Sequence, residues 1–342
     1  MALYNIIGDI HGRTSWKDLV REDCINIFIG DYFSPYHPQY FEDLEANFKE
    51  ILKYKEEHPE TVLLLGNHDV EGFVHEAYSR HDYENENTIR NFFAQNEDLF
   101  QIAYAIDNKV LVTHAGLTDD WYSKYKYHTL PVIEIWLDNP NEVDNISDAY
   151  KKYHQEKTDK NVMLGPLENL PYYSEYSDED KEWMEKQRQI ELEKNRKLAE
   201  HPLKNTMFFW KGNYYFYDAE KNEYEKLEFN LQEIANFINK LWKDKKYASF
   251  SFDANAGHYD CYGESTTHGP LWIRPAGLHT ANLFKFSEIW QVVGHTMQHQ
   301  GVEINNGSKI CFVDCLEYVP MSLIYDSETG EFKRNHKKEV TK

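Results

Sequence analysis

Six short apolar runs, each followed at once by a polar cluster, constrain the fold of this chain most strongly. The runs are Leu3–Ile7, Ile25–Ile29, Val62–Leu65, Val110–Thr113, Gln291–Val293 and Ile310–Val313. Runs of this length, rich in Val, Ile and Leu, predict strands that are covered on both faces. In layered α/β proteins, ligands collect beyond the carboxyl ends of such strands, where Gly permits tight turns. The polar residues that follow the runs are therefore expected to converge.

Helical patterns lie between these runs. The clearest covers Phe41–Lys55, where apolar residues recur at the spacing of one buried helix face before Pro59 ends the pattern. Alternating strands and helices predict a layered α/β fold.

The pattern breaks down in the middle of the chain. This region is rich in Tyr, Glu and Lys and contains a charged helix candidate, Asp178–Glu200, and an amphipathic one, Leu231–Leu241. We interpret it as an insertion. The expected division is a catalytic domain over residues 1–118 and 248–326, an insertion or cap over 119–247, and a loosely held polar tail over 327–342.

The chain is strongly acidic. Its 342 residues include 37 Lys and Arg against 58 Asp and Glu, which gives a net charge of −21. Such a field repels nucleic acid and anionic membranes, so neither is expected as a partner. Phosphate esters are anionic too, so binding one would require a local positive centre, which metal ions could supply.

The cysteines predict a reducing environment. The chain has four, Cys24, Cys261, Cys311 and Cys315, which are too few and too irregularly spaced for a disulfide framework. We expect Cys311 and Cys315 to pack rather than react. The N-terminus enters a strand-like run without a secretory signal, and no apolar stretch of about 18 residues occurs. These features predict a soluble, cytoplasmic protein.

Side chains that bind metals stand where the predicted strands end. Asp9 and His11 are two residues apart, so in an extended chain they share one face. Asp31 follows the next strand, and its two carboxylate oxygens could bridge two ions. The other candidate ligands are the amide of Asn67 and the imidazoles of His114 and His295. This mixed nitrogen and oxygen set suits manganese, iron or zinc better than calcium or a thiolate-rich structural zinc site.

These residues belong to five ordered blocks. The blocks read Gly8-Asp9-Ile10-His11-Gly12, Gly30-Asp31, Gly66-Asn67-His68-Asp69, Thr113-His114-Ala115-Gly116-Leu117 and Gly294-His295-Thr296. In this order they resemble the signature of calcineurin-like metallophosphoesterases, over residues 2–118 and 257–316. Because Met297 follows the last block, where nucleases and cyclic-nucleotide phosphodiesterases usually have a second His, the resemblance is to the branch of Ser/Thr phosphoprotein phosphatases and bacterial diadenosine tetraphosphate hydrolases.

The resemblance implies a fold, two cofactors and a mechanism. The fold would be a four-layer α/β/β/α sandwich of two mixed sheets with a helix-rich insertion. Two divalent metal ions would be bound, manganese first, with iron or zinc as alternatives. The first would be held by Asp9, His11 and Asp31, the second by Asp31, Asn67, His114 and His295, with His68 as the catalytic proton donor. Such a pair clamps both oxygens of an in-line displacement and lowers the pKa of a bound water, so that a metal-held hydroxide would attack phosphorus.

The chain departs from that signature after Asp31. There the family has an acid that pairs with the catalytic His and an Arg that binds phosphate, whereas this chain has Ser34 and Pro35. Their loss would weaken the orientation of His68 and remove a bidentate contact to the substrate. Arg274 resembles a second phosphate-contacting Arg of bacterial members, although an Arg in such a loop often packs on an aromatic ring. Asp69 is expected to serve the structure rather than to orient His68.

Three functions are compatible with this sequence. The first is hydrolysis of phosphate monoesters on a phosphorylated protein or nucleotide, as in Ser/Thr protein phosphatases. The second is hydrolysis of the phosphoanhydride of a dinucleoside polyphosphate, with the same metals and a different leaving-group pocket. The third is a catalytically weak metal-binding scaffold, because Ser34 and Pro35 replace the usual pair.

Overall fold

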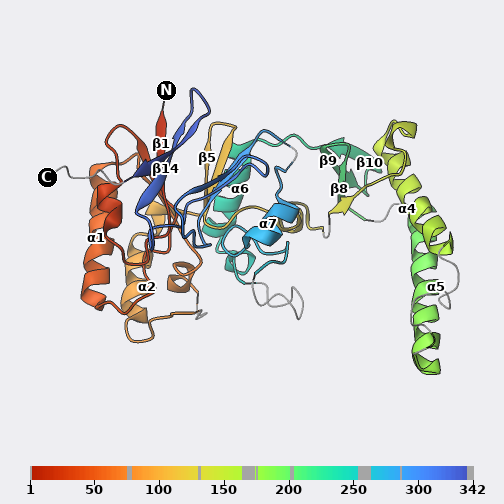
Figure 1. The fold of residues 1–342 in the computed structure, drawn as a ribbon, viewed down its shortest axis with the longest axis horizontal. Helices are drawn as coiled ribbons and strands as arrows, with labels where there is room; N and C mark the ends of the chain where they lie inside the picture. The colour runs from red at the N-terminus through yellow and green to blue at the C-terminus, as the bar shows by residue number, and fades with distance from the viewer. Residues whose placement is uncertain are drawn as a thin grey trace. The chain divides into compact units, whose positions relative to one another are not determined.

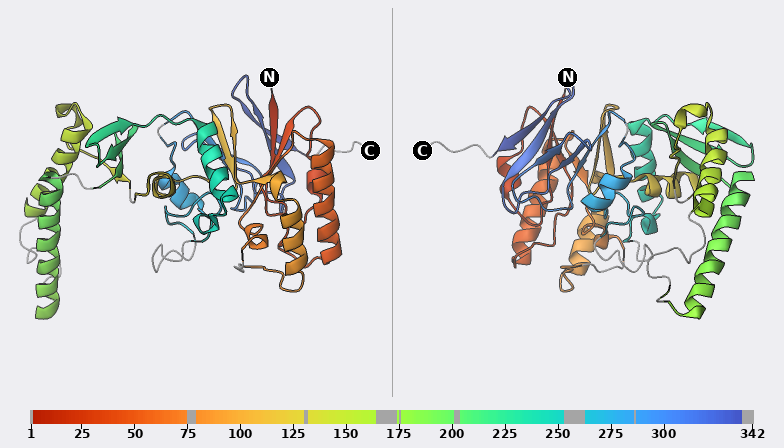
Figure 2. Two further views of the ribbon diagram at one scale, coloured as in Figure 1. Left: turned by 180° about the vertical axis from the view of Figure 1, so that it is seen from behind. Right: turned by 45° about the vertical axis from the view of Figure 1, so that its right-hand side comes forward.

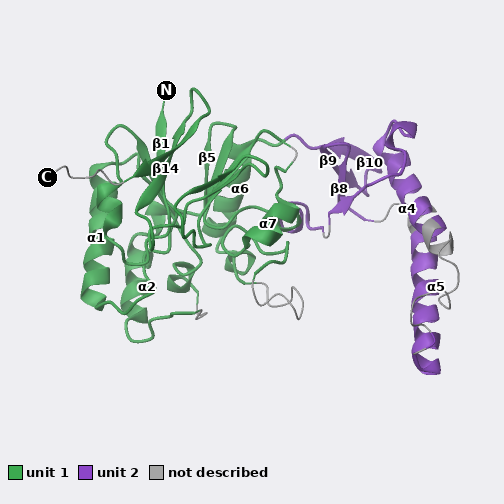
Figure 3. Cartoon of the chain, in the orientation of Figure 1, with its two compact units in different colours: residues 1–122, 229–342 green, residues 123–228 purple. Residues whose placement is uncertain are grey.

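The computed structural model describes most of the chain. The described residues are 2–74, 79–129, 132–163, 174, 176–200, 204–252, 263–285 and 287–336. Cys261 and residues 337–342 of the expected tail lie outside them. The chain divides into two compact units, unit 1 with residues 1–122 and 229–342 and unit 2 with residues 123–228 (Figure 3).

Unit 1 contains two mixed sheets. The first has the strand order β15-β14-β1-β2-β3-β4. Its strands are β1 (Leu3–Ile7), β2 (Ile25–Phe28), β3 (Val62–Leu64), β4 (Phe100–Gln101), β14 (Met321–Asp326) and β15 (Phe332–His336). The strands β1 to β4 are parallel, whereas β14 and β15 pair antiparallel.

The second sheet has the order β12-β13-β11-β6-β5. Its strands are β5 (Ala103–Ile106), β6 (Val110–Thr113), β11 (Trp290–Val293), β12 (Glu303–Asn305) and β13 (Ile310–Phe312). The three central strands are parallel, and β5 and β12 pair antiparallel at the edges. All six strands predicted from the apolar runs are present, which confirms that part of the analysis.

The two sheets pack face to face over one apolar core. The first sheet contributes side chains such as Ile6 and Leu64, and the second contributes Val112, Val292 and Cys311. The cysteines Cys24, Cys311 and Cys315 are buried and unpaired. Burial raises the pKa of the Cys315 thiol to about 12, so the expectation that Cys311 and Cys315 pack is confirmed.

Helices cover the outer faces of both sheets. On the first sheet lie α1 (Phe41–Glu57) and α2 (Glu86–Gln95), and on the second lie α6 (Leu231–Lys243) and α7 (Pro275–Ala281) (Figures 1 and 2). The buried side chains of α1 include Leu44, Phe48 and Ile51, as the helical pattern predicts. This is the predicted four-layer α/β/β/α sandwich.

Unit 2 combines a helix pair with a small sheet. The helices are α4 (Ile146–Met163) and α5 (Asp178–Glu200), and the sheet has the order β10-β9-β8-β7. The strands are β7 (Ile133–Glu134), β8 (Thr206–Trp210), β9 (Asn213–Asp218) and β10 (Glu223–Lys226). Tyr150 of α4 packs with Phe208 and Tyr217 in its core. The sequence analysis predicts helices but no sheet in this region.

Two segments differ from the sequence analysis. The helix α6, expected in the insertion, packs on β5 in unit 1 through its apolar face. The tail expected to be loosely held forms β15 over Phe332–His336, because Phe332 packs on Tyr325 and Trp290 and the backbone pairs with β14.

A short helix α3 (Asp119–Tyr122) follows β6 and its ligand-bearing turn. Among the described residues, no helix is long and apolar enough to cross a membrane.

Candidate metal centre

Each of the six predicted metal ligands follows the carboxyl end of a parallel strand. In the first sheet, Asp9 and His11 follow β1, Asp31 follows β2 and Asn67 follows β3. In the second sheet, His114 follows β6 and His295 follows β11. All six side chains are buried. Because parallel strands end at the same edge of a sheet, the six side chains meet.

Asp31 lies at the middle of this set. Its Oδ2 is 3.5 Å from Nε2 of His11 and 3.6 Å from Nε2 of His114. Nε2 of His11 also lies 3.9 Å from Oδ2 of Asp9. Ligand atoms of Asp9, Asp31 and His114 all lie within 4.8 Å of one another, so one cation could contact several of them.

The amide oxygen of Asn67 joins the two imidazoles of the second sheet. This Oδ1 is 2.9 Å from Nε2 of His114 and 2.8 Å from Nδ1 of His295. The centroids of the two rings are 5.2 Å apart. His295 is therefore linked to Asp31 through Asn67 and His114, although residues 31 and 295 are far apart in sequence.

The orientation of the imidazoles fits divalent cations. Nδ1 of His11 faces the carbonyl oxygen of Phe33 at 3.2 Å, and Nδ1 of His114 faces that of Ile29 at 3.1 Å. A carbonyl oxygen only accepts, so the tautomer with the hydrogen on Nδ1 suits these two contacts, and that tautomer leaves a lone pair on each Nε2 toward Asp31. Burial lowers the pKa of both rings, to about 3 for His11, which keeps them neutral. Lone pairs and a carboxylate repel each other, whereas a cation between them would attract both.

Carboxylates crowd the same interior. Burial raises the pKa of Asp9 well above its usual value, and the neighbouring Asp314 and Asp31 raise it further. Asp314, which follows β13 and was not a predicted ligand, has its pKa raised to about 7 by burial. Neither of its carboxylate oxygens has a hydrogen-bond partner within the described part of the chain. Divalent cations would offset this buried negative charge.

The ligands stand on tight turns. His11, Asp31 and His295 have φ values of 44°, 54° and 62°, a left-handed conformation that is uncommon for residues other than Gly. A Cβ on Gly66 would lie 2.1 Å from Oδ1 of Asp31, and one on Gly294 would lie 2.0 Å from Oδ1 of Asp9. The close approach of backbone to ligand therefore requires Gly at these two positions.

Asp69 fixes the turn that carries Asp31. Its carboxylate accepts hydrogen bonds from the backbone N–H groups of Asp31 at 2.6 Å, Tyr32 at 2.9 Å and Gly66 at 2.8 Å. The N–H of His68 donates to Oδ1 of Asp31 at 2.9 Å. The expectation that Asp69 serves the structure is thereby confirmed.

His68 lies next to the predicted ligands. Its ring centroid is 5.8 Å from that of His11. Its Nδ1 is 3.6 Å from Oε1 of Glu71, and Nη2 of Arg80 approaches its Nε2 at 2.8 Å. Sequence reasoning missed both neighbours. Glu71 follows His68 by three residues, a spacing that brings side chains together in a helical turn and could have indicated it, whereas Arg80 has no such signal.

The model of the calcineurin-like phosphoesterase family matches residues 4–195. This range is more than half of the 342 residues. The chain belongs to the calcineurin-like phosphoesterase family. The matched range contains five of the six predicted ligands, and His295 lies beyond it.

A solved structure shows a distant similarity to this phosphoesterase. It is a protein serine/threonine phosphatase from Saccharomyces cerevisiae with similarity to human phosphatase PP5, at 13% sequence identity and a TM-score of 0.40. The similarity covers 98% of this chain and 80% of that chain. No curated protein matches the sequence.

Arg274 of the phosphoesterase supports the turn of the last ligand. Its Nη1 donates to the carbonyl oxygen of His295 at 2.6 Å and to Oγ1 of Thr296 at 3.2 Å. The guanidinium also lies within electrostatic reach of Asp9 and Asp31. The structure thus brings Arg274 to the metal centre, and its contact with a substrate phosphate stays a prediction.

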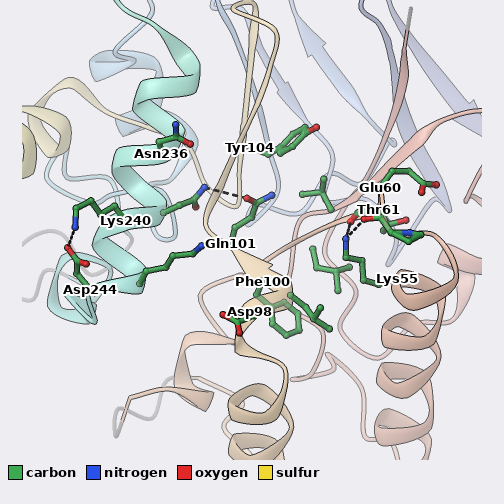
Figure 4. A pocket seen from close by; sticks show the side chains of 16 residues that line it. Lys55, Glu60, Thr61, Asp98, Phe100, Gln101, Tyr104, Asn236, Lys240 and Asp244 are labelled. Carbon is green, nitrogen blue, oxygen red and sulfur yellow. Dashed lines mark hydrogen bonds and ion pairs between the residues drawn. The ribbon is translucent and has the colours of Figure 1, made fainter.

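A groove elsewhere in unit 1 of the phosphoesterase contains none of the candidate ligands. It has a cavity volume of about 840 Å³ and is lined by parts of α1, β3, β4 and α6 (Figure 4). Lys55 donates there to the carbonyl oxygens of Pro59 and Thr61, and Lys240 pairs with Asp244 at 2.6 Å. Lys55 and Lys240 are already bound to neighbouring groups of the protein. The side chains of this groove therefore do not converge on one point, as the candidate ligands do.

Proposed function

We propose that this phosphoesterase hydrolyses phosphate monoesters, with a phosphorylated protein as its substrate, as in Ser/Thr protein phosphatases. The observation that carries the proposal is the buried ring of ligands around Asp31, in which neutral imidazoles turn their lone pairs toward carboxylate and amide oxygens. That arrangement suits two divalent cations, for which manganese is proposed. We place the protein in the cytoplasm, without a membrane or nucleic-acid partner.

The residues of the candidate metal centre would have separate roles in binding the cations and in proton transfer. Asp9, His11 and Asp31 would hold the first cation, and Asp31, Asn67, His114 and His295 the second. Bound there, the pair supplies Lewis-acid stabilisation of phosphoryl oxygens and a water of lowered pKa. His68 would protonate the leaving oxygen, since its ring stands beside the ligands with Nε2 turned away from Glu71.

A turnover panel tests this function. The manganese-loaded protein is assayed on p-nitrophenyl phosphate, a phosphopeptide, diadenosine tetraphosphate and bis-p-nitrophenyl phosphate. We expect turnover of the monoesters, reduced about 10²- to 10⁴-fold in kcat by His68→Ala, which removes the proton donor. Asp31→Asn should lower both turnover and the bound metal measured by mass spectrometry, because it removes a bridging carboxylate.

The controls are His279→Ala and Asp244→Asn, which make the same changes at exposed positions. Preference for diadenosine tetraphosphate over the phosphopeptide in kcat/KM would select the phosphoanhydride function instead. A fully metal-loaded protein without turnover on any of these esters would contradict the proposal and leave the scaffold reading.

A further inference from the structure

The segment after β3 places a buried acid beside His68. Glu71 lies in the short helical turn Val70–Gly72, with its side chain 6% exposed. Its Oε1 is 3.6 Å from Nδ1 of His68, and its Oε2 is hydrogen-bonded to Nδ1 of His81. Both carboxylate oxygens therefore face imidazole rings in a buried environment, with a hydrogen bond to His81 and a longer contact to His68, whose Nδ1 has no hydrogen-bond partner among the described residues.

Glu71 is held in place from α2. Nε2 of His81 lies 3.5 Å from Oε2 of Glu86, in the first turn of that helix. Glu86 is held in turn by Nε of Arg90 at 2.8 Å. This chain of contacts fixes the carboxylate of Glu71 before any substrate binds, which is the requirement for a positioning group.

Arg80 lies on the other side of the same ring. Its Nη2 is 2.8 Å from Nε2 of His68, and its guanidinium carbon lies 3.9 Å from the ring centroid of Tyr36. The Tyr36 ring in turn packs edge-on against His11 at 4.7 Å. Nη1 of Arg80 is buried and has no hydrogen-bond partner among the described residues. An anion entering the centre would supply the acceptor that this donor lacks.

The backbone at Arg80 supports the same reading. Its φ is 65°, a left-handed conformation that costs free energy for a side chain of this size. His11, Asp31 and His295 share that conformation at the metal centre. Strained residues of this kind persist where the surrounding structure fixes them, often at functional sites.

We propose that Glu71 positions His68 for proton transfer and that Arg80 binds the phosphoryl group of the substrate. The proposal rests on the function proposed above and adds two residues to it. It also explains how the chain could work with Ser34 and Pro35 in place of the acid and the Arg of the signature. Ser34 lines the same small cavity of about 20 Å³ as His68 and Glu71, so the acid reaches this space from the segment after β3 instead.

The two residues would act in sequence. In the structure, Arg80 donates to Nε2 of His68, so the ring carries its hydrogen on Nδ1, toward Glu71. When the phosphoryl oxygens bind the guanidinium, Nε2 is released from Arg80 and takes a proton from solvent, while Nδ1 keeps its hydrogen on the side of Glu71. As the bond from phosphorus to the leaving oxygen breaks, that oxygen keeps the electron pair and takes the proton from Nε2. The ring returns to its neutral form, the oxygen of the attacking water becomes bonded to phosphorus, and that water gives up a proton to solvent.

The leaving group provides the test of Glu71. Glu71→Gln keeps the shape and removes the charge, and Glu71→Asp keeps the charge. With phenyl phosphate, whose leaving group needs a proton, Glu71→Gln should lower kcat at least about tenfold, a part of what a general acid contributes. With p-nitrophenyl phosphate the loss should be smaller, KM should stay unchanged, and Glu71→Asp should recover part of the rate.

The control for Glu71 is Glu84→Gln, the same change at an exposed position of the same segment. In a His68→Ala background, Glu71→Gln should have no further effect, because its partner is gone. Equal losses with both esters, or a Glu71→Gln protein as active as Glu84→Gln, would overturn the positioning role. If Glu71→Gln does not fold, the ester dependence of Glu71→Asp decides the question in the same way.

Phosphate binding provides the test of Arg80. Arg80→Ala should weaken the affinity for inorganic phosphate, measured by calorimetry, about 10- to 100-fold, as expected for the loss of a charged hydrogen-bond donor. Added guanidinium should restore part of the turnover, and Arg21→Ala, a change at an exposed position, is the control. Unchanged phosphate affinity in Arg80→Ala would overturn this role. A wild-type protein without turnover would contradict the proposed function alone, since phosphate affinity is measured without catalysis.

Discussion

At the scale of single residues, the centre depends on side chains that hold one another before any ion binds. Asp69 fixes the turn of Asp31 through three backbone N–H groups. Carbonyl oxygens of Phe33 and Ile29 fix the tautomers of two imidazoles. Because Asp31, His11 and His114 have partners of this kind, metal binding needs little rearrangement of these three ligands.

The position of Glu71 yields a prediction for the residues that depart from the family signature. The double substitution Ser34→Asp with Pro35→Arg should not raise kcat/KM, because Glu71 and Arg80 already face His68. A new carboxylate in the cavity shared with Glu71 should instead lower the free energy of unfolding by about 1 kcal/mol or more, through like-charge repulsion and desolvation.

Steady-state kinetics and urea unfolding check this prediction, with the Ser34→Asn protein as the control for volume. A clear gain in kcat/KM would mean that His68 lacks an acid in the present chain. That result would also remove the basis for assigning Glu71.

Single residues were predictable where they follow a strand. The six ligands stand directly after apolar runs, so spacing alone brought them to one edge of the sheets. Glu71 and Arg80 were not found, because their approach to His68 depends on how the chain turns back after β3. Asp314 follows a predicted strand too, and only its burial without a partner marks it.

At the scale of secondary-structure elements, one polar side chain adds hydrogen bonds to the apolar packing of α6 on the second sheet. Asn239 accepts hydrogen bonds from the N–H groups of Ile102 and Ala103 at 2.9 and 3.0 Å, and donates to the carbonyl oxygen of Ala103 at 2.8 Å. These bonds satisfy the backbone of an edge strand that no neighbouring strand covers. The helix is therefore part of the sandwich rather than of unit 2.

Asn239→Ala should lower the free energy of unfolding by about 1–3 kcal/mol, because it leaves backbone N–H groups without a partner. Urea unfolding measures the change. Asn236→Ala, on the exposed face of the same helix, should change stability by less than about 0.5 kcal/mol. Similar values for the two variants would mean that α6 contributes nothing specific to β5.

Elements were predictable where their sequence is uniformly apolar. The strand β14 was not predicted, because Ser322 interrupts its apolar pattern. The hydroxyl of Ser322 donates to Oδ1 of the buried Asn5 at 2.6 Å. Polar residues that satisfy one another across strands interrupt the apolar pattern without interrupting the sheet. The strands β4, β5 and β12 lie at sheet edges, and their sequences contain Gln101, Tyr104, and Glu303 with Asn305, so they do not form uninterrupted aliphatic runs.

At the scale of the whole molecule, the chain has a net charge of −21 and also buries several carboxylates close together in the candidate metal centre. In the folded protein without metal, burial raises the pKa values of Asp9 and Asp314. Metal binding requires the deprotonated form of the candidate ligand Asp9, and nearby cations would also favour the deprotonated form of Asp314. Folding, protonation and metal binding are therefore coupled.

This coupling predicts how stability depends on pH. A carboxyl group whose pKa is higher in the folded state binds more protons when folded, so the free energy of unfolding falls as pH rises. For Asp314 this fall runs from its ordinary pKa near 4 up to about 7, with a slope of at most about 1.4 kcal/mol per pH unit. Bound divalent cations would remove this penalty, so the difference in Tm between metal-loaded and chelated protein should widen from about pH 5 to about pH 7.

Differential scanning calorimetry at several pH values checks the prediction. In the Asp314→Asn protein the chelated form should lose part of its pH dependence. A Tm difference that stays constant over the whole range would show that the buried carboxylates do not titrate with the metal.

The pairing of β1 with β14 bears on how the chain is made. Leu3 stands opposite Asp326, and β1 lies between β14 and β2. During synthesis β1 leaves the ribosome long before β14 is translated. The edge of β1 that pairs with β14 therefore stays unpaired until Met321–Asp326 has emerged. His295 is translated in the same late stretch, which means that the nascent chain acquires its last metal ligand and the neighbour of its first strand almost together.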